Sequence, residues 1–124
     1  MIERMDHFTV VTDVLKETTD FYTGLGFMEG QRPNFTVPGA WLYLDGKPVL
    51  HIIERHTMPN PRRGVLDHMA FAGRGLQGFL ALLDQRAIAY KVIRAPAPYL
   101  TWQVFFEDPN GCAVEVDFDA GESN

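Results

Sequence analysis

A repeated spacing of potential metal ligands most constrains what this chain can fold into. Asp-His pairs occur at positions 6–7 and 67–68, 61 residues apart, each at the start of an apolar stretch. His51 and Glu115 lie 64 residues apart, each inside a later apolar stretch. Nearly equal offsets between two sets of residues indicate a duplicated unit. The pattern therefore predicts two similar halves with a metal site between them.

Length and composition restrict the class of protein. A chain of 124 residues is expected to form a single domain, residues 1–124, with a core that needs no disulfide. The single cysteine cannot form an intrachain disulfide. A net charge of −5 argues against nucleic acid as a partner, and no apolar run approaches the length of a membrane span. A soluble, cytoplasmic protein is expected.

The first half predicts a strand, a helix and three further strands. Residues 5–12 alternate as a strand, and Asp13 is placed to cap the helix that follows. Gly24 and Gly26 are expected to end that helix. The further strands are expected at 27–31, 40–45 and 48–54. An Asp-Gly turn signal separates the last two.

The second half predicts the same order of elements. A strand at 66–72 precedes a helix with apolar side chains at helical spacing, namely Leu76, Phe79, Leu80 and Leu83. Three strands follow, at 89–94, 101–107 and 112–118. Residues 56–64 contain prolines and arginines and are typical of a linker, in which His56 is expected to be exposed.

Both halves thus predict a βαβββ module, at about residues 3–55 and 65–118. The expected fold is α+β, with a curled mixed sheet, a cup or half-barrel, and helices on its outer face. Alternation along the strands assigns apolar rows to the helix side. It assigns the four candidate ligands to the other face: His7, His51, His68 and Glu115. By the same alternation, Asp6 and Asp67 point to the face opposite these ligands, and they are expected to be strand-end or helix-side groups and not metal ligands.

Short runs of sequence beside these ligands resemble a known family. They are the two Asp-His strand openings, residues 41–46 (WLYLDG) before 48–51 (PVLH), and residues 105–111 (FFEDPNG) before 114–115 (VE). With the paired modules, they resemble the vicinal oxygen chelate superfamily. That superfamily contains glyoxalase I, fosfomycin-modifying enzymes, methylmalonyl-CoA epimerase, bleomycin-binding proteins and extradiol dioxygenases. The resemblance covers roughly residues 3–118.

The resemblance implies a divalent metal ion, Fe, Mn, Ni or Zn, bound by His7, His68 and Glu115. This set leaves coordination positions open for substrate oxygens. Position 51 distinguishes branches of the superfamily. Glyoxalase-like members carry a carboxylate there as a metal ligand, so His51 would be a fourth ligand. Ring-cleaving members carry a nearby histidine that acts as an acid or base. His51 and Glu115 are therefore the candidates for moving a proton.

The resemblance implies a metal-dependent lyase or isomerase of glyoxalase type, in which the metal stabilises an enolate or oxyanion. An extradiol-type Fe(II) dioxygenase is one alternative, although Phe105 stands where those enzymes carry a tyrosine and residues 95–98 lack their histidine. A second alternative is a non-catalytic small-molecule binding protein of the bleomycin-resistance type. Members of that type have usually lost their metal ligands.

Further side chains are predicted to contact a small-molecule substrate. Four of them lie, by alternation along their strands, on the sheet face expected to line the cup: Trp41, Tyr43, Gln103 and Phe105. Arginines in the loops and at strand ends are candidates for an anionic group of the substrate, namely Arg94, Arg32, Arg62 and Arg63. Because members of the resembled superfamily often dimerise, a homodimer is also expected.

Overall fold

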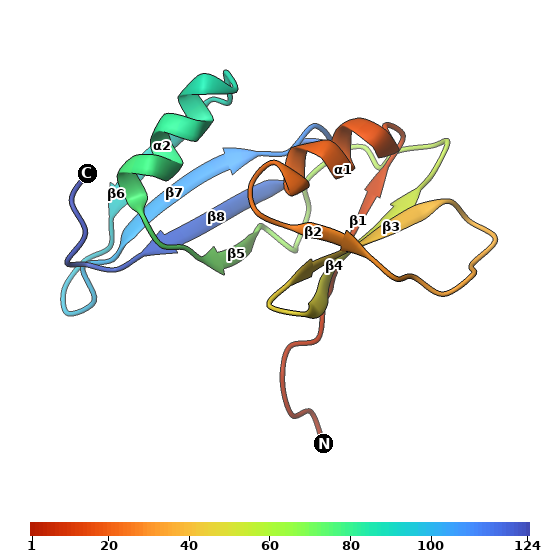
Figure 1. The fold of residues 1–124 in the computed structure, drawn as a ribbon, viewed down its shortest axis with the longest axis horizontal. Coiled ribbons are helices and arrows are strands. Elements are labelled where there is room, and N and C mark those ends of the chain that lie inside the picture. The colour runs from red at the N-terminus through yellow and green to blue at the C-terminus, as the bar shows by residue number, and fades with distance from the viewer. The chain divides into compact units, whose positions relative to one another are not determined.

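The structure, a computed structural model, describes residues 1–124 and divides into two compact units, Met1–Arg62 and Arg63–Asn124 (Figure 1). Each unit contains a strand, a helix and three further strands. Each also forms a four-stranded mixed sheet of its own. The predicted α+β class and the two βαβββ modules are therefore confirmed. A single domain and a curled cup stay predictions.

The first unit is a sheet with strand order β1-β4-β3-β2. Its elements are β1 (Phe8–Thr12), α1 (Leu15–Thr23), β2 (Met28–Gly30), β3 (Gly39–Leu44) and β4 (Lys47–Glu54). Strand β1 runs parallel to β4, and the other pairs are antiparallel. Asp45 and Gly46 join β3 to β4 with φ angles of 50° and 73°. An Asp-Gly pair with two positive φ angles makes a tight hairpin turn, as the sequence predicted.

One face of this sheet is the core of the first unit. Leu50 and Ile52, which alternate with His51 along β4, are fully buried, and so is Leu42 on β3. Helix α1 packs on β3 and β4. Tyr22 of α1 is fully buried and meets Phe27 edge to face at 5.6 Å. Period-two burial on the strands, covered by one helix, leaves the opposite face available for the candidate ligands.

The start of α1 differs from the prediction. Val14, and not Asp13, is the residue before the first helical turn, and it makes no side-chain capping hydrogen bond. The Thr12 hydroxyl accepts a hydrogen bond from the Val14 amide at 2.9 Å and contacts the Thr18 hydroxyl at 2.9 Å. Thr12 and Thr18 are fully buried. A buried hydroxyl at the end of β1 therefore satisfies an amide at the start of α1.

The second unit repeats the arrangement, with strand order β5-β8-β7-β6. Its elements are β5 (Met69–Ala72), α2 (Leu76–Gln85), β6 (Tyr90–Arg94), β7 (Trp102–Glu107) and β8 (Ala113–Phe118). Phe79 of α2 lies against Phe106 of β7 and Phe118 of β8, with ring centroids 5.9 and 5.3 Å apart. Figure 1 shows α2 along the face of this sheet. The helical spacing predicted from the sequence thus supplies the core of this unit.

Helix α2 is capped by a residue from the end of the chain. Gly75 precedes it with a φ of 84°, and the Glu122 carboxylate accepts hydrogen bonds from the Gly75 and Leu76 amides. The indole N–H of Trp102 donates to the Glu122 carbonyl at 2.7 Å. A carboxylate at a helix N-terminus satisfies free amides and opposes the positive end of the helix dipole.

The helices contain nine and ten residues. A membrane span requires roughly 20 apolar residues. Neither helix is long and apolar enough to cross a membrane.

Candidate functional site

The two Asp-His pairs have the same local geometry in the two units. His7 Nδ1 lies 2.6 Å from Asp6 Oδ2, and His68 Nδ1 lies 2.8 Å from Asp67 Oδ2. Both aspartates lie just before a strand, which is the first of the two positions predicted for them, and each contacts the histidine beside it. Strands β1 and β5 begin only after the histidines, so strand alternation does not apply to either pair.

These hydrogen bonds determine which ring nitrogen of each histidine can bind a metal. A carboxylate accepts, so Nδ1 of His7 and of His68 carries the hydrogen. Nε2 then presents its lone pair when the ring is neutral. Metal-binding histidines commonly donate their other nitrogen to a carboxylate in this way. Both Asp-His pairs thus have the donor chemistry of metal ligands.

His51 lies in the middle of a stack of three rings in the first unit. Register places Trp41 of β3 directly opposite His51 of β4. Their ring centroids are 3.9 Å apart, and the planes differ by 9°. The ring of His7 covers the other side of His51 at 3.8 Å. His51 Nε2 donates to the Pro48 carbonyl at 3.0 Å, which leaves the lone pair on Nδ1.

The surroundings of His51 favour its neutral form. Burial lowers the pKa of His51, and the nearby charges of His7 and Arg32 lower it further, against the opposing effects of the Pro48 carbonyl and Asp6. A cation loses hydration when it is buried, so the neutral ring is preferred. At neutral pH His51 therefore offers an unprotonated Nδ1, as a ligand or a base requires.

Glu115 is the centre of the candidate site in the second unit. It lies on β8 opposite Ala70 of β5 and Phe105 of β7, and is 5 % exposed. Gln103 Nε2 donates to Glu115 Oε1 at 2.6 Å. His68 Nε2 lies 2.7 Å from Glu115 Oε2. The two atoms expected to bind a metal therefore face one another in this unit.

A further carboxylate affects this pair. Burial raises the pKa of Glu115, and Asp117 raises it again, whereas His68 and Gln103 lower it by less. The pKa of His68 is raised, first by its hydrogen bond to Asp67 and also by Glu115. One Asp117 oxygen is buried without a hydrogen-bond partner. Sequence analysis missed Asp117, although its position two residues after Glu115 places it on the same strand face.

The structure brings the candidate ligands together in pairs, His7 with His51 and His68 with Glu115. It contains no group of three or more His, Cys, Asp or Glu side chains placed to hold a metal ion. The four-ligand set predicted from the sequence stays a prediction.

A cavity of about 360 Å³ lies beside the ring stack of the first unit. His7, His51 and Trp41 line it, together with Arg32 from the loop after β2 and Arg55 after β4. Sequence analysis did not name Arg55. The signal was available, because positions 51, 53 and 55 alternate onto one face and all three line the cavity.

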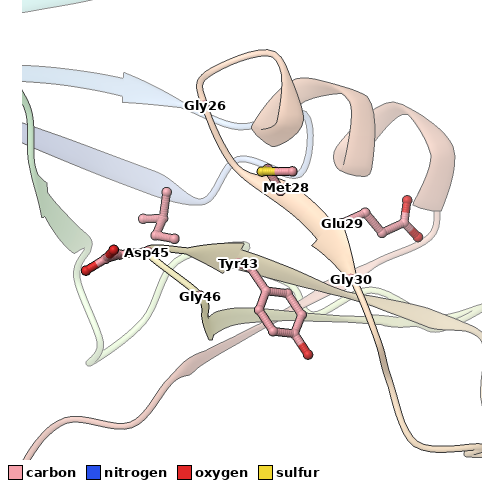
Figure 2. Close-up of a pocket in the computed structure, with 8 residues that line it drawn as sticks. Gly26, Met28, Glu29, Gly30, Tyr43, Asp45 and Gly46 are labelled. Atoms are coloured by element: carbon pink, nitrogen blue, oxygen red, sulfur yellow. The ribbon is translucent and has the colours of Figure 1, made fainter.

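Tyr43 faces a different hollow. Its hydroxyl donates to the Gln31 carbonyl at 2.6 Å, and its ring fills the space that a side chain at Gly30 would occupy. Figure 2 shows this hollow, of about 320 Å³, between β2 and the turn after β3. Tyr43 does not line the cavity that contains His51, and its contact with substrate stays a prediction.

The predicted substrate-binding arginine of the second unit has partners within the protein. Arg94 donates to the Ala120 carbonyl at 2.9 Å, and its guanidinium lies 4.2 Å from the centre of the Trp102 ring. Arg63 forms an ion pair with Glu107 at 2.5 Å. An anionic substrate would have to compete with these contacts.

Residues 4–116 match the model of the Glyoxalase/Bleomycin resistance protein/Dioxygenase superfamily. A search of curated proteins finds no match.

Solved structures with the same fold include a glyoxalase family protein from Enterococcus faecalis, with 24% identity, a TM-score of 0.71 and coverage of 93% of this chain and 97% of that chain. A glyoxylase/bleomycin resistance protein/dioxygenase domain from Frankia sp. EAN1pec has 20% identity and a TM-score of 0.77, and the match covers 99% of this chain and 96% of that chain. A mutant of the fosfomycin resistance protein FosX from Listeria monocytogenes, complexed with Mn(II) and 1S,2S-dihydroxypropylphosphonic acid, has 16% identity and a TM-score of 0.78, with 96% and 94% covered. At these identities the similarity shows the fold alone.

Proposed function

Because the chain belongs to the Glyoxalase/Bleomycin resistance protein/Dioxygenase superfamily, we propose that it is a divalent-metal-dependent enzyme whose small substrate binds through two vicinal oxygens. The observation that carries this proposal is the pair of Asp-His hydrogen bonds, which leave Nε2 of His7 and of His68 as the metal-binding atom. The FosX relative, which is complexed with Mn(II), supports a metal-dependent activity.

His7, His68 and Glu115 hold the metal in this proposal, and His51 is the candidate fourth ligand. Two imidazoles and a carboxylate suit Fe, Mn, Ni or Zn. The bound ion supplies Lewis acidity that stabilises an enolate or oxyanion on the substrate, as in lyases and isomerases of glyoxalase type. Gln103 orients the Glu115 carboxylate by donating to Oε1 and leaves Oε2 toward His68.

In the proposed reaction a proton is moved by His51 or by Glu115, whichever of the two is not bound to the metal at that step. His51 takes a proton at Nδ1 while its Nε2–H remains bonded to the Pro48 carbonyl, which keeps the ring oriented. Trp41 and Phe105 exclude water beside the histidines. The other predicted contacts with substrate are Gln103, Tyr43 and Arg94.

Metal analysis of protein purified without chelators tests this function. We expect about one divalent ion per chain, and much weaker Mn²⁺ and Zn²⁺ binding in the His7→Ala, His68→Ala and Glu115→Ala variants. His56→Ala is the matched control, because His56 is exposed and lies outside both pairs. Wild-type protein that neither retains nor binds a divalent ion would overturn the proposal.

A substrate screen separates the reaction types. Hemithioacetals and epoxides test glyoxalase-like and fosfomycin-resistance-like chemistry, and catechols test the extradiol alternative. Only ring cleavage by Fe(II) consumes oxygen, so an oxygen electrode distinguishes that alternative. A pH–rate profile of His51→Ala then assigns His51. Retained metal with lost activity identifies an acid or base, and lost metal identifies a ligand.

Small-molecule binding without catalysis is the second candidate function. The cavity beside Trp41 favours it, since aromatic and cationic walls suit ligand binding whether or not a metal is present. It becomes the better description if the protein binds organic ligands with no affinity for divalent ions.

We also propose a homodimer. Within its own unit, each sheet leaves an edge strand on either side, β1 and β2 in the first unit and β5 and β6 in the second. Edge strands carry unpaired backbone groups, and a second copy of the chain is a common way to cover them. Light scattering during size-exclusion chromatography should give twice the 14.0 kDa chain mass. A mass of one chain would contradict this.

A further inference from the structure

Two arginines line the cavity of the first unit, Arg32 and Arg55, and neither forms an ion pair with an Asp or Glu. Arg32 donates from Nη2 to the Val37 carbonyl at 2.9 Å, and its guanidinium lies 5.0 Å from the centre of the Phe35 ring. Its Nε is buried and has no hydrogen-bond partner. Arg55 lines the same cavity, and no Asp or Glu lines it. A buried donor without a partner indicates a place for an acceptor that the chain itself does not supply.

The backbone holds Arg32 in this position. A β-carbon added at Gly39 would lie 2.8 Å from Arg32 Nη2 and 2.2 Å from the Ile52 carbonyl oxygen. Glycine at this position therefore lets the guanidinium lie close against the start of β3. The contacts with Val37 and Phe35 hold it from the other side. A cation held in place before binding loses less conformational freedom when it binds an anion.

Apolar side chains form one part of the cavity wall, and Thr9, Thr36, His7 and His51 add polar groups to it. Trp41, Phe35, Val37 and Ile53 line it beside the two arginines. The volume of about 360 Å³ is at the small end of the range for pockets that bind small molecules. The lining therefore suits a compact ligand with one anionic end and an apolar body.

We propose that this cavity binds a small organic anion, with Arg32 and Arg55 on its carboxylate, phosphate or phosphonate group and Trp41 and Phe35 against its apolar body. The proposal rests on the metal-dependent function above, and it names the class of substrate. His7 and His51 line the same cavity, so the proposed anion site lies beside two of the candidate metal ligands. Guanidinium groups suit this role because they donate in a planar fork to two oxygens of one anion.

Isothermal titration of the full-length protein tests the proposal, with chelator-treated and Mn²⁺-loaded samples measured in parallel. The probes are phenylphosphonate and benzoate, with benzyl alcohol as the neutral analogue and inorganic phosphate as an anion that lacks an apolar body. We expect phenylphosphonate, benzoate or both to bind at least about tenfold more tightly than benzyl alcohol or phosphate. The comparison of phenylphosphonate with benzoate identifies the preferred anionic group.

Charge-removing variants locate the binding. Arg32→Gln and Arg55→Gln should each raise the dissociation constant of the anionic probe by about tenfold. Arg32→Lys should recover only part of that loss, because it keeps the charge without the planar fork. Lys47→Gln is the matched control, since it removes an exposed positive charge from β4 outside the cavity, and it should bind normally. Thermal melts confirm that each variant is folded.

Three results would overturn the inference: no binding of either anion, equal binding of benzyl alcohol, or unchanged binding in both arginine variants. Phosphate binding as tight as that of phenylphosphonate would also overturn it, since the apolar walls would then contribute nothing. Anion binding to the chelator-treated protein is measured independently of the metal. Failure of this inference and failure of the proposed metal site are therefore distinguishable.

Discussion

The ring of His7 lies face to face with the ring of His51, with centroids 3.8 Å apart and planes inclined by 17°. His7 comes just before β1, and His51 lies within β4, so the parallel pairing of these strands brings together residues distant in sequence. Charge on one ring disfavours charge on the other at this separation. The pair is therefore suited to offering lone pairs to a metal ion.

The pKa values of two histidines should be shifted in opposite directions from the ordinary value of 6.5. Burial and His7 lower the pKa of His51, whereas Asp67 and Glu115 raise the pKa of His68. Ring-proton chemical shifts of the metal-free protein, followed by NMR from pH 4 to 9, should place His51 below 6.5 and His68 above it. Asp67→Ala should lower the His68 value, and Trp41→Leu should raise the His51 value by admitting water.

The same pKa shifts determine whether each histidine makes the folded protein more or less stable as the pH changes. The contribution of His68 is fully present below pH 6.5 and is lost as the pH rises through its folded-state pKa. His51 has the opposite effect. Its pKa is lower in the folded protein than in the unfolded chain, so protonation below pH 6.5 favours the unfolded chain and stability falls. His51→Gln should therefore reduce the loss of stability on acidification, in urea unfolding of the metal-free protein. An unchanged pH profile would contradict this assignment.

The aspartates before the two proposed ligand histidines, His7 and His68, should influence metal affinity without binding the metal. Removing a carboxylate that orients a ligand histidine typically weakens metal binding by about 10- to 100-fold. We expect this loss in Asp6→Ala and in Asp67→Ala, measured by Mn²⁺ or Zn²⁺ titration. Asp13→Ala is the control, because Asp13 is exposed and does not precede a histidine. Equal affinity in all three variants would show that the Asp-His bonds have no part in metal binding.

Most of the fold follows from local patterns in the sequence. Period-two alternation identified the buried rows of both sheets, and the Asp45-Gly46 pair identified its hairpin turn. The errors lie at element ends. Asp6 and Asp67 precede strands that begin later than predicted, and Val14, not Asp13, is the residue before the first turn of α1. Alternation does not predict the direction of a side chain beyond the end of a strand, because that direction depends on tertiary contacts.

Less of the site followed from the sequence, because register is not local. Trp41 and Tyr43 share a strand face by alternation, yet Trp41 stacks on His51 and Tyr43 reaches another hollow. The pairing of β3 with β4 decides this, and it shifts between Leu42 and Leu44. The buried nitrogen of Arg32 likewise depends on how the loop after β2 folds back on β3.

The single cysteine should be nearly inert toward alkylating agents. Burial, with help from Asp108, raises the pKa of Cys112 from 9.0 to about 11, against a smaller opposing effect of Arg63. A rise of about two units makes the thiolate roughly 100-fold scarcer than in the unfolded chain below pH 9. Iodoacetamide labelling at pH 8, compared between native and urea-unfolded protein, measures this difference.

This shift also predicts loss of stability in alkali. The unfolded thiol ionises near pH 9 and the folded one near 11, so the contribution of Cys112 is intact below pH 9 and is lost as the pH rises toward 11. Cys112→Ala should show a shallower loss over that interval. Rapid labelling of the native protein at pH 8 would contradict both expectations.

Glu122 should stabilise α2 from the far end of the chain. Its carboxylate accepts from the Gly75 and Leu76 amides, so Glu122→Ala leaves both donors without this partner. Loss of a capping side chain typically lowers the free energy of unfolding by about 1 kcal/mol. Glu122→Gln keeps an acceptor and loses the charge facing the helix dipole, an effect of roughly 0.5 kcal/mol. Urea unfolding followed by circular dichroism measures both losses.

Amide hydrogen exchange locates the Glu122 effect on the helix. Exchange at Gly75 and Leu76 should accelerate in Glu122→Ala, whereas exchange within α1 should not change, because α1 lies in the other unit. Glu3→Ala is the control, since it removes an exposed carboxylate near the N-terminus and should leave stability and exchange unaltered. Equal exchange at Gly75 and Leu76 in the wild type and Glu122→Ala would mean that the carboxylate does not protect these amides in solution.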